Sequence, residues 1–277
     1  MARIDLAGKP IAITGASSGI GRATAIACAR AGMPVAVGAR RPGPLRALVE
    51  EISAAGGRAL AVEMDTTRRE DCRALVDETV RAFGSIYAVY ANAGYGLEAA
   101  FDQMSDEQMR AIFETNFFGT LNVIRPALEH MKRARAGHVL VCSSCVSRFP
   151  LPYYGAYSAT KAAQFHIARA MRSELRPFGI FVSPVLPTGT RTEFFDRVRR
   201  PDGSARSIEH MPAWLLQSAD HVAQRTLNCL RRPRSEVWTS FPLRLAMGLC
   251  NTFPMLMDLG QRVSLRSRPG PIPPATS

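Results

Sequence analysis

The 277-residue chain lacks any run of 18 unbroken apolar residues, which excludes a helix that spans a membrane by itself. Its first ten residues, MARIDLAGKP, contain no apolar stretch of the kind that secretory leaders carry, so we expect a cytoplasmic protein. No internal repeat or low-complexity block occurs, which excludes a solenoid. With 47% hydrophobic and 21% charged residues, the composition is that of an ordinary globular protein.

Lysine is also scarce, because Lys9, Lys132 and Lys161 are the only lysines among 35 basic residues. Against 23 acidic residues the formal net charge is +12. Such a balance suits nucleic acid, an anionic membrane surface or an anionic ligand. The arginines are scattered among the expected helices, and no basic patch is interleaved with aromatic residues, so we expect no nucleic-acid partner.

A disulfide framework and a metal-binding pattern are missing as well. The cysteines at positions 28, 72, 142, 145, 229 and 250 lie in apolar segments, which indicates buried thiols in a reducing compartment. Cys142 and Cys145 form a CxxC pair, but neither a second pair nor a nearby histidine completes a zinc site. The five histidines fit no ligand spacing either, so we expect no metal.

What the sequence has is a regular alternation of short apolar runs and helical periods. Strands are expected at residues 10–14, 34–39, 58–64, 86–92, 137–143, 180–186 and 236–240, and helices at 19–31, 44–55, 68–83, 105–132, 154–176 and 218–231, the last with Ser218 as its N-cap. This alternation predicts an α/β fold, a doubly wound parallel sheet with helices on both faces.

The alternation breaks after residue 192. Residues 193–217 are polar with one amphipathic patch, and residues 242–261 form an apolar helix that Pro254 should kink. From residue 263 the composition is typical of a disordered tail. We expect a single domain over residues 1–277, with a dinucleotide-binding and catalytic core at 6–192. Residues 193–262 would supply substrate-cleft helices, the last strand and the C-terminal apolar helix.

Residues 13–21, ITGASSGIG, connect an expected strand to an expected helix and contain glycines at positions 15, 19 and 21. A helix N-terminus presents unpaired N–H groups and a positive dipole end, which together bind anions. Glycine permits positive φ and a close approach of phosphate to the backbone. Hydroxyls of Thr14, Ser17 and Ser18 can cap the turn or contact phosphate. The turn therefore predicts a nucleotide site.

Five motifs together resemble those of the short-chain dehydrogenase/reductase family. TGASSGIG is similar to the family's TGxxxGxG turn, ANAG (91–94) to its NNAG, and Asn116 in ETNFFG to its mid-helix asparagine. The serines at 143–144 and YSATK (157–161) are similar to its catalytic serine and YxxxK. The resemblance covers residues 6–192. It implies a Rossmann-type sheet of about seven strands in the order 3-2-1-4-5-6-7, a bound nicotinamide dinucleotide, and homodimers or homotetramers formed through the helices at 105–132 and 154–176.

The end of the second expected strand indicates which dinucleotide binds. It reads VGARR, with Arg40 and Arg41 where an acidic residue would select NAD, and Arg40 is similar to the arginine of NADP-preferring family members, so we expect NADP(H). By resemblance Asp65 bonds the adenine amino group, although its position equally suits a turn residue. The resemblance assigns cofactor contacts to Thr14, Gly15, Ser17, Ser18, Gly19, Ile20, Gly21, Arg40, Arg41, Asp65, Thr66, Asn92, Ala93, Gly94, Tyr157, Lys161, Pro187, Thr190 and Thr192.

Tyr157 and Lys161 are spaced i, i+4 and share one face of the expected helix. An ammonium near a phenol favours the phenolate and lowers the phenol pKa, which suits proton exchange near neutral pH. Ser144 precedes Tyr157 by thirteen positions, as in the family, and would hold the reacting oxygen. Ser143 is the alternative for this role. Asn116 would anchor a water that links Lys161 to solvent.

One motif departs from the family pattern. The family usually shows PGxxxT after the sixth strand, whereas LPTGTRTEF has Pro187 and Thr192 in register but Thr188 in place of glycine. Gly189 would then take up the turn one residue later.

Residues 145–155 and 193–217 should line an apolar substrate cleft, with Ser144, Phe149, Tyr153, Tyr154 and Tyr157 among the substrate contacts. We therefore expect an NADP(H)-dependent oxidoreductase that acts on a hydrophobic carbonyl or secondary alcohol, of the steroid, retinoid, fatty or aromatic type. The alternatives are a 3-oxoacyl-thioester reductase and a non-catalytic NADP-binding regulator. Residues 242–261 would cover the cleft, pack at a subunit interface, or rest on a membrane surface.

Overall fold

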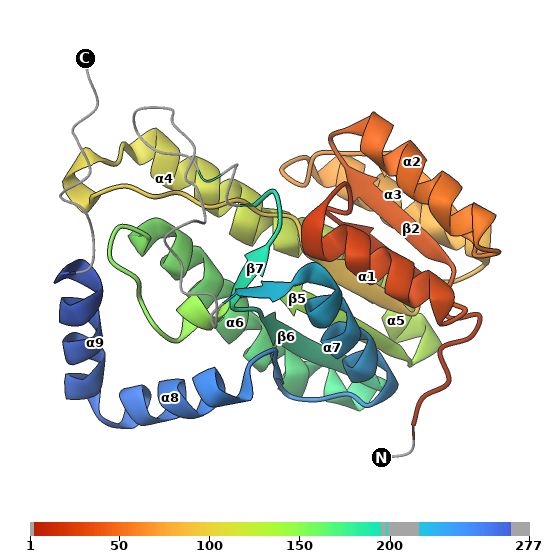
Figure 1. Cartoon of the computed structure of the whole chain (residues 1–277). Helices are drawn as coiled ribbons and strands as arrows, with labels where there is room; N and C mark the ends of the chain where they lie inside the picture. The colour runs from red at the N-terminus through yellow and green to blue at the C-terminus, as the bar shows by residue number, and fades with distance from the viewer. Residues whose placement is uncertain (1–2, 195–197, 199–215, 267–277) are drawn as a thin grey trace.

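The structure is a computed structural model that describes residues 3–194, 198 and 216–266. Seven parallel strands form its main sheet in the order β3-β2-β1-β4-β5-β6-β9 (Figure 1). The strands are β1 Ile11–Thr14, β2 Val35–Ala39, β3 Ala59–Glu63, β4 Ala88–Ala91, β5 Gly137–Cys142, β6 Ile180–Leu186 and β9 Val237–Trp238. The predicted order is confirmed. Its seventh strand is β9 because β7 (Gly189–Arg191) and β8 (Leu216–Ser218) pair separately, in a small parallel sheet.

Helices cover both faces of the sheet, as predicted (Figure 1). One face packs against α1 (Gly19–Arg30), α2 (Pro42–Ala54) and α7 (Ala219–Arg231), and the other against α3 (Arg69–Phe83), α5 (Gly119–Ala134) and α6 (Gly155–Glu174). Ser218 caps α7 as expected, because its hydroxyl accepts a hydrogen bond from the His221 N–H at 3.1 Å.

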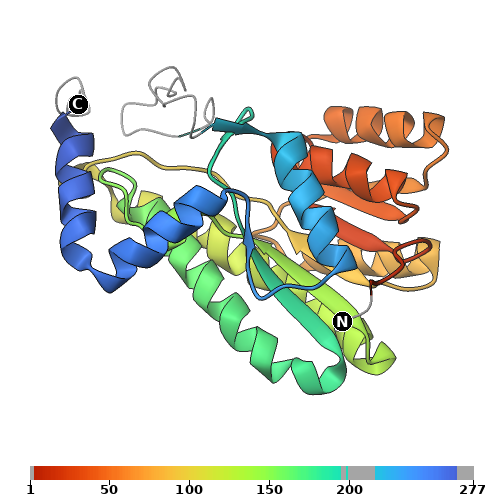
Figure 2. The ribbon, with the colours of Figure 1, turned by 60° about the horizontal axis from the view of Figure 1, so that its bottom comes forward.

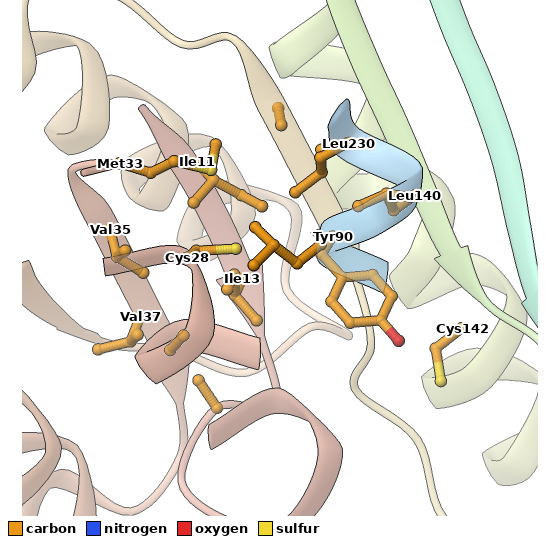
Figure 3. Packing of buried hydrophobic residues seen from close by; sticks show 14 of the residues in the cluster. Ile11, Ile13, Cys28, Met33, Val35, Val37, Tyr90, Leu140, Cys142 and Leu230 are labelled. Carbon is orange, nitrogen blue, oxygen red and sulfur yellow. The ribbon is translucent and has the colours of Figure 1, made fainter. Parts of the chain in front are cut away.

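The core is built from strand residues that point alternately to the two faces. Ile11 and Ile13 lie in the cluster beneath α1, whereas Ala12 lies in the cluster beneath α3 and α5. Figure 3 shows this packing, with the fully buried Tyr90 reaching toward Cys142. A parallel sheet buried on both faces needs apolar residues at every strand position. That is why the strands could be identified from short, unbroken apolar runs.

His138 in β5 is fully buried, and its Nε2 lies 2.9 Å from the Ser183 hydroxyl of β6. Burial, and secondarily the charge of Arg172, lowers the pKa of His138 from 6.5 to about 3. Because the unfolded chain protonates this histidine first, the stability that the neutral ring contributes is present above pH 6.5 and lost as pH falls toward 3. We expect this one group to lower the free energy of unfolding by about 1.4 kcal/mol per pH unit.

Urea denaturation of the wild type and of His138→Gln between pH 6.5 and 5 measures this slope. The variant should show a smaller slope than the wild type by that amount. Equal slopes in the two proteins would contradict the assignment.

The expected single helix at 105–132 is interrupted. It consists of α4 (Asp106–Phe113), a π-helical turn at Glu114–Phe118, and α5. Ser105 and Gln108 form a reciprocal capping box at the start of α4. A π turn holds one extra residue in the helix, and single turns of this kind often mark functional sites. Here the extra residue alters the direction of the Asn116 side chain.

The apolar C-terminal segment forms two helices, α8 (Phe241–Thr252) and α9 (Pro254–Arg266), which meet at a sharp corner (Figures 1 and 2). The predicted kink at Pro254 is therefore a complete break, because proline cannot donate the hydrogen bond that would continue α8. The disordered tail was predicted too early, since α9 continues to Arg266. Residues 267–277 of that tail lie outside the described residues.

Candidate active site

The predicted site residues gather along the carboxyl ends of the parallel strands. The sheet order changes direction between β1 and β4, and ligands of doubly wound sheets bind at such a switch point. The glycine turn follows β1, and ANAG follows β4. Arg41, Asp65, Ser144 and Pro187 follow β2, β3, β5 and β6.

Each of the three glycines stands where a side chain would collide. A Cβ on Gly15 (φ +67°) would lie 2.8 Å from the Ala93 Cα, and one on Gly21 would lie 2.5 Å from the Gly15 carbonyl oxygen. A Cβ on Gly19 (φ +57°) would lie 3.1 Å from the Thr192 side chain. The turn packs directly on the neighbouring loops, and its backbone N–H groups form the start of α1.

Thr14 and Asn92 hold this turn in place. The buried Thr14 hydroxyl accepts hydrogen bonds from the Asn92 and Ala93 N–H groups, both at 3.1 Å. The Asn92 amide donates to the carbonyls of Thr14 at 3.0 Å and Gly15 at 3.3 Å. Both side chains are engaged within the protein, so they position the site. Ser18 differs, because it is the N-cap residue of α1 and its hydroxyl makes no capping bond.

Of the two candidate arginines, Arg41 lies against the glycine turn. Its guanidinium donates to the Ser17 hydroxyl at 3.0 Å and forms an ion pair with Glu193 at 3.4 Å. Both partners of that pair are nearly half exposed, so it contributes little stability. Arg40 is exposed at the end of the strand. Ile20 of α1 packs on the core behind the turn.

Asp65 forms a turn with the residues that follow it. Its carboxylate accepts hydrogen bonds from both the N–H and the hydroxyl of Thr67 at 2.9 Å. The carbonyl of Thr66 accepts from the Asn122 amide at 3.0 Å, and the side chain of Thr66 fills the space beside Gly119. Within the protein, Asp65 therefore has the contacts of a turn residue, which is one of the two roles that its sequence position allowed.

Tyr157, Lys161 and Ser144 meet beside Gly94. The Lys161 Nζ lies 5.6 Å from the centroid of the Tyr157 ring and donates to the Cys142 carbonyl at 2.7 Å. A hydrogen bond with Ser144 acts on the Tyr157 phenol. A Cβ on Gly94 would lie 2.9 Å from the Asn116 Oδ1 and 3.7 Å from the Lys161 Nζ. The bare backbone at Gly94 therefore borders these polar groups.

Burial reverses the expected pKa shift of Tyr157. Removal of the phenol from water raises its pKa, nearby Cys142 and Cys145 raise it further, and the Ser144 hydrogen bond lowers it in part. Desolvation also lowers the pKa of Lys161. The expected lowering by the lysine is overturned because Lys161 is itself buried and turned toward the Cys142 carbonyl. Tyr157 is consequently protonated at neutral pH.

The choice between the two serines follows from their contacts. The Ser143 hydroxyl is buried and donates to the Lys161 carbonyl at 2.8 Å. It fixes α6 to the end of β5 and is not available to a substrate. Ser144 begins a short helical turn, accepts from the Val146 N–H at 3.3 Å, and interacts with Tyr157.

Asn116 is fully buried, and its side chain joins three segments. Its Nδ2 donates to the Tyr95 carbonyl at 3.0 Å and to the Thr160 hydroxyl at 3.1 Å, while its Oδ1 accepts from the Tyr95 N–H at 3.0 Å. Its carbonyl accepts from the Gln164 amide and the Thr120 hydroxyl. Gln164 was missed by the sequence reasoning. Gln164 could have been identified in the sequence as an amide side chain three residues after Lys161, on the face of the helix that is buried.

The loop after β6 packs against the segment that follows β5. The Pro187 carbonyl accepts from the Cys145 N–H at 3.0 Å, and the Thr190 hydroxyl donates to the Thr188 carbonyl at 3.0 Å. The Thr192 hydroxyl accepts from the Phe194 N–H at 3.2 Å. In this part of the described chain neither Thr188 nor Gly189 has a positive φ. A threonine therefore fits where the family has glycine, and Gly189 does not take up a special turn.

The predicted substrate residues lie at the open end of this group. The rings of Tyr154 and Phe194 lie 6.4 Å and 5.7 Å from the Tyr157 ring, centroid to centroid. Tyr153 has a φ of +67°, which is rare for a side chain of its size and is found mostly at functional sites. Phe149 is half-buried in the same segment. Most of the expected lining at 193–217, namely 195–197 and 199–215, lies outside the described residues.

Two kinds of feature are absent from the described residues. Over residues 3–194, 198 and 216–266, no cluster of three or more acidic, histidine or cysteine side chains has the arrangement of a metal site. Within those same residues, no helix combines the length and apolarity needed to cross a bilayer.

A glycine-rich turn between β1 and α1, at the switch point of a doubly wound parallel sheet, is typical of Rossmann-type folds that bind dinucleotides. The sequence profile of the short chain dehydrogenase family matches residues 9–203. The chain therefore belongs to that family, whose members are oxidoreductases that bind a nicotinamide dinucleotide.

Individual relatives agree with this assignment. An uncharacterized oxidoreductase of Methylorubrum extorquens is 36% identical over 189 residues, which cover 68% of this chain and 75% of the relative. An 11-beta-hydroxysteroid dehydrogenase A of Arachis hypogaea is 36% identical over 62% of this chain and 49% of its own length. The crystal structure of a 3-ketoacyl-ACP reductase from Sinorhizobium meliloti is 31% identical with a TM-score of 0.73, over 83% of this chain and 96% of that one.

Proposed function

We propose that the protein is an NADP(H)-dependent reductase of hydrophobic carbonyl compounds that also oxidises the matching secondary alcohols. The observation that carries this proposal is that Ser144 and Lys161 both lie near Tyr157. Lys161 also lies near Gly94, which follows Ala93, and the glycine turn packs on Ala93. Asn116 completes the set through its contacts with the Tyr95 backbone and Thr160.

The residues present fit a dinucleotide. Gly15 and Gly21 keep the turn packed tightly on its neighbours, because a Cβ on either would come within 3.0 Å of protein atoms. The turn leads into the N-terminus of α1, where backbone N–H groups can bind a phosphate. The remaining predicted contacts follow the carboxyl ends of the strands, and they include Thr66, Ala93, Pro187, Thr190 and Thr192. The bound nicotinamide supplies the hydride in reduction and accepts it in oxidation.

The residues of the chain itself handle the proton and the substrate oxygen. Tyr157 is protonated at neutral pH, since burial raises its pKa, and its phenol would be the source of the proton that reaches the oxygen of a carbonyl. The Ser144 hydroxyl would hold that oxygen as negative charge develops on it. This arrangement supports reduction as the direction at neutral pH.

Arg41 is proposed to bind the 2′-phosphate that distinguishes NADPH from NADH. It already lies against Ser17 of the turn, and a guanidinium binds phosphate in a bidentate manner. We expect Arg41→Ala to raise the KM for NADPH about 10- to 100-fold, since a charge-assisted hydrogen bond contributes about 1.5–3 kcal/mol. The KM for NADH should change little.

Steady-state kinetics with both dinucleotides measure this, and Arg40→Ala is the matched control. We expect the smaller effect from Arg40→Ala, because Arg40 is exposed at the strand end. An unchanged KM for NADPH in both variants would contradict the NADP assignment.

The apolar surroundings of Tyr157 support a hydrophobic substrate. The rings of Tyr154 and Phe194 flank it, and one relative is a hydroxysteroid dehydrogenase by name. The 3-ketoacyl-ACP reductase similarity favours a 3-oxoacyl thioester as the second candidate. NADPH oxidation at 340 nm with steroid, retinal, fatty and aromatic ketones and with 3-oxoacyl thioesters decides between them. No turnover with any compound, despite tight NADPH binding, would favour a regulator.

The wider organisation is part of the same proposal. We propose one domain, because α7 and β9 residues such as Leu230 and Val237 share a core cluster with Ile11 of β1. Family members are often oligomeric, which supports a homodimer or homotetramer through α4, α5 and α6. All six cysteines are free thiols, which supports a reducing, cytoplasmic location.

A further inference from the structure

Helix α8 is apolar on two opposite sides but covers the protein with only one of them. Leu243, Met247 and Cys250 are turned inward, and Met247 is 7% exposed. Phe241, Leu245 and Leu249 follow one another at four-residue intervals on the outer side, at 67%, 59% and 49% exposure. A helix with apolar residues all round is normally buried on all sides. The outer side of α8 therefore calls for an apolar partner.

The same surface continues around the corner onto α9. Phe253 between the helices is 57% exposed, and Met255, Leu256 and Leu259 of α9 are 81%, 45% and 60% exposed. These four and the three outer residues of α8 make up the apolar arm. Across the described residues, Phe101 and Phe118 are the only other large apolar side chains so exposed. Seven exposed apolar side chains on two adjoining helices mark an interaction site.

Charge and shape decide what binds the arm. Residues 241–266 contain Arg244, Arg262 and Arg266 against the single acid Asp258, within a chain of net charge +12. Helices that combine exposed Phe, Leu and Met with arginine bind anionic lipid surfaces. Figures 1 and 2 show that α8 and α9 project from the body and meet at an outward corner. A bilayer can enclose such a convex edge, whereas a protein interface needs a broad matching face of about 800 Å² per partner.

The arm is also fixed relative to the rest of the molecule. The Gln261 amide of α9 donates to the Pro150 carbonyl at 3.0 Å, and Met247 anchors α8 to the body. The family profile ends at residue 203, so the arm lies outside the part of the chain that it matches. We propose that α8 and α9 dock the protein on an anionic lipid bilayer. The apolar arm would insert among the headgroups, and the arginines of the two helices would contact lipid phosphate.

Flotation of the purified full-length protein with vesicles tests the proposal. The vesicles contain either phosphatidylcholine alone or phosphatidylcholine with 30% phosphatidylglycerol, so that the dependence of binding on lipid charge can be measured. We expect the wild type to float with the anionic vesicles and far less with the neutral ones. The triple variant Leu245→Gln/Leu249→Gln/Leu256→Gln should bind at least about tenfold more weakly, because insertion scales with buried apolar area.

Phe101→Gln is the matched control, since it removes an 86% exposed aromatic outside the arm and should leave vesicle binding unchanged. Arg244→Glu/Arg262→Glu should weaken binding to anionic vesicles alone. Circular dichroism and the dinucleotide affinity verify that every variant is folded. Three results would overturn the proposal: no flotation of the wild type, equal flotation of the triple variant, or conversion of an oligomer to a smaller species by the triple variant. The last would make a second copy of the chain the partner of the arm.

Discussion

Tyr157→Phe should reduce turnover about 10²- to 10⁴-fold, the range that a positioned acid–base group contributes. The phenol interacts with Ser144, lies near the Lys161 ammonium, and is protonated at neutral pH because burial raises its pKa. Phenylalanine keeps the ring and its contacts with Tyr154 and Phe194 but has no proton to give. Stopped-flow and steady-state measurements of NADPH oxidation report the loss, and calorimetry should show unchanged NADPH affinity.

Tyr154→Phe is the natural control, since it removes a hydroxyl from the adjacent ring and leaves Tyr157 in place. We expect any effect of this change on KM and not on kcat. A Tyr157→Phe enzyme that reduces its substrate at the wild-type rate would end the assignment of Tyr157 as the proton donor.

Gly15→Ala should abolish dinucleotide binding and lower the free energy of unfolding by about 2–4 kcal/mol. Its φ of +67° is unfavourable for any residue with a Cβ, and the added methyl would lie 2.8 Å from the Ala93 Cα. The collision is with backbone, so the two loops that form the cradle must separate. Urea denaturation measures the stability, and calorimetric titration with NADPH measures the binding.

Gly8→Ala separates the two contributions. Gly8 has a φ of +70°, but a Cβ there would meet nothing within 4 Å. This variant should lose about 1 kcal/mol through backbone strain and keep full dinucleotide affinity. If Gly15→Ala behaves like Gly8→Ala, the close packing of the turn on Ala93 has no functional importance.

Most of the strands could be predicted because their burial is visible in short stretches of the sequence. Strands such as β2 and β4 are buried on both faces, so they read as uninterrupted apolar runs, and α7 was located from its N-cap Ser218. The strand order itself came from the family resemblance. The short β7 and β8 were not found, because three-residue strands carry no periodicity.

The sequence indicated which residues gather at the site better than it indicated what each side chain does there. The sequence left open whether the Thr14 hydroxyl caps the turn or contacts phosphate, and in the structure Thr14 and Asn92 hold the turn together by hydrogen bonds. Spacing favoured Ser144 with Ser143 as the alternative, and the hydrogen bond from Ser143 to the Lys161 carbonyl supports the same choice. Roles of this kind depend on which backbone atoms become neighbours in three dimensions, and a single sequence does not specify them.

The pKa of Tyr157 shows the limit of a pairwise argument. The i, i+4 spacing correctly places Lys161 on the same face of α6, at 5.6 Å from the ring centroid. The direction of the shift, however, depends on how much water the whole fold removes from the phenol, and desolvation is the largest contribution. Burial is a property of all the surrounding elements, so no motif within one helix can supply it.

The π turn at Glu114–Phe118 has a consequence for chain length. One extra residue rotates everything downstream by about 100°, a single step of the helical wheel. Deletion of one residue there would let the helix become regular along its whole length, but it would swing Asn116 out from between Tyr95 and Thr160. The five residues of the π turn therefore do not form a regular α-helix and at the same time keep Asn116 bonded between Tyr95 and Thr160.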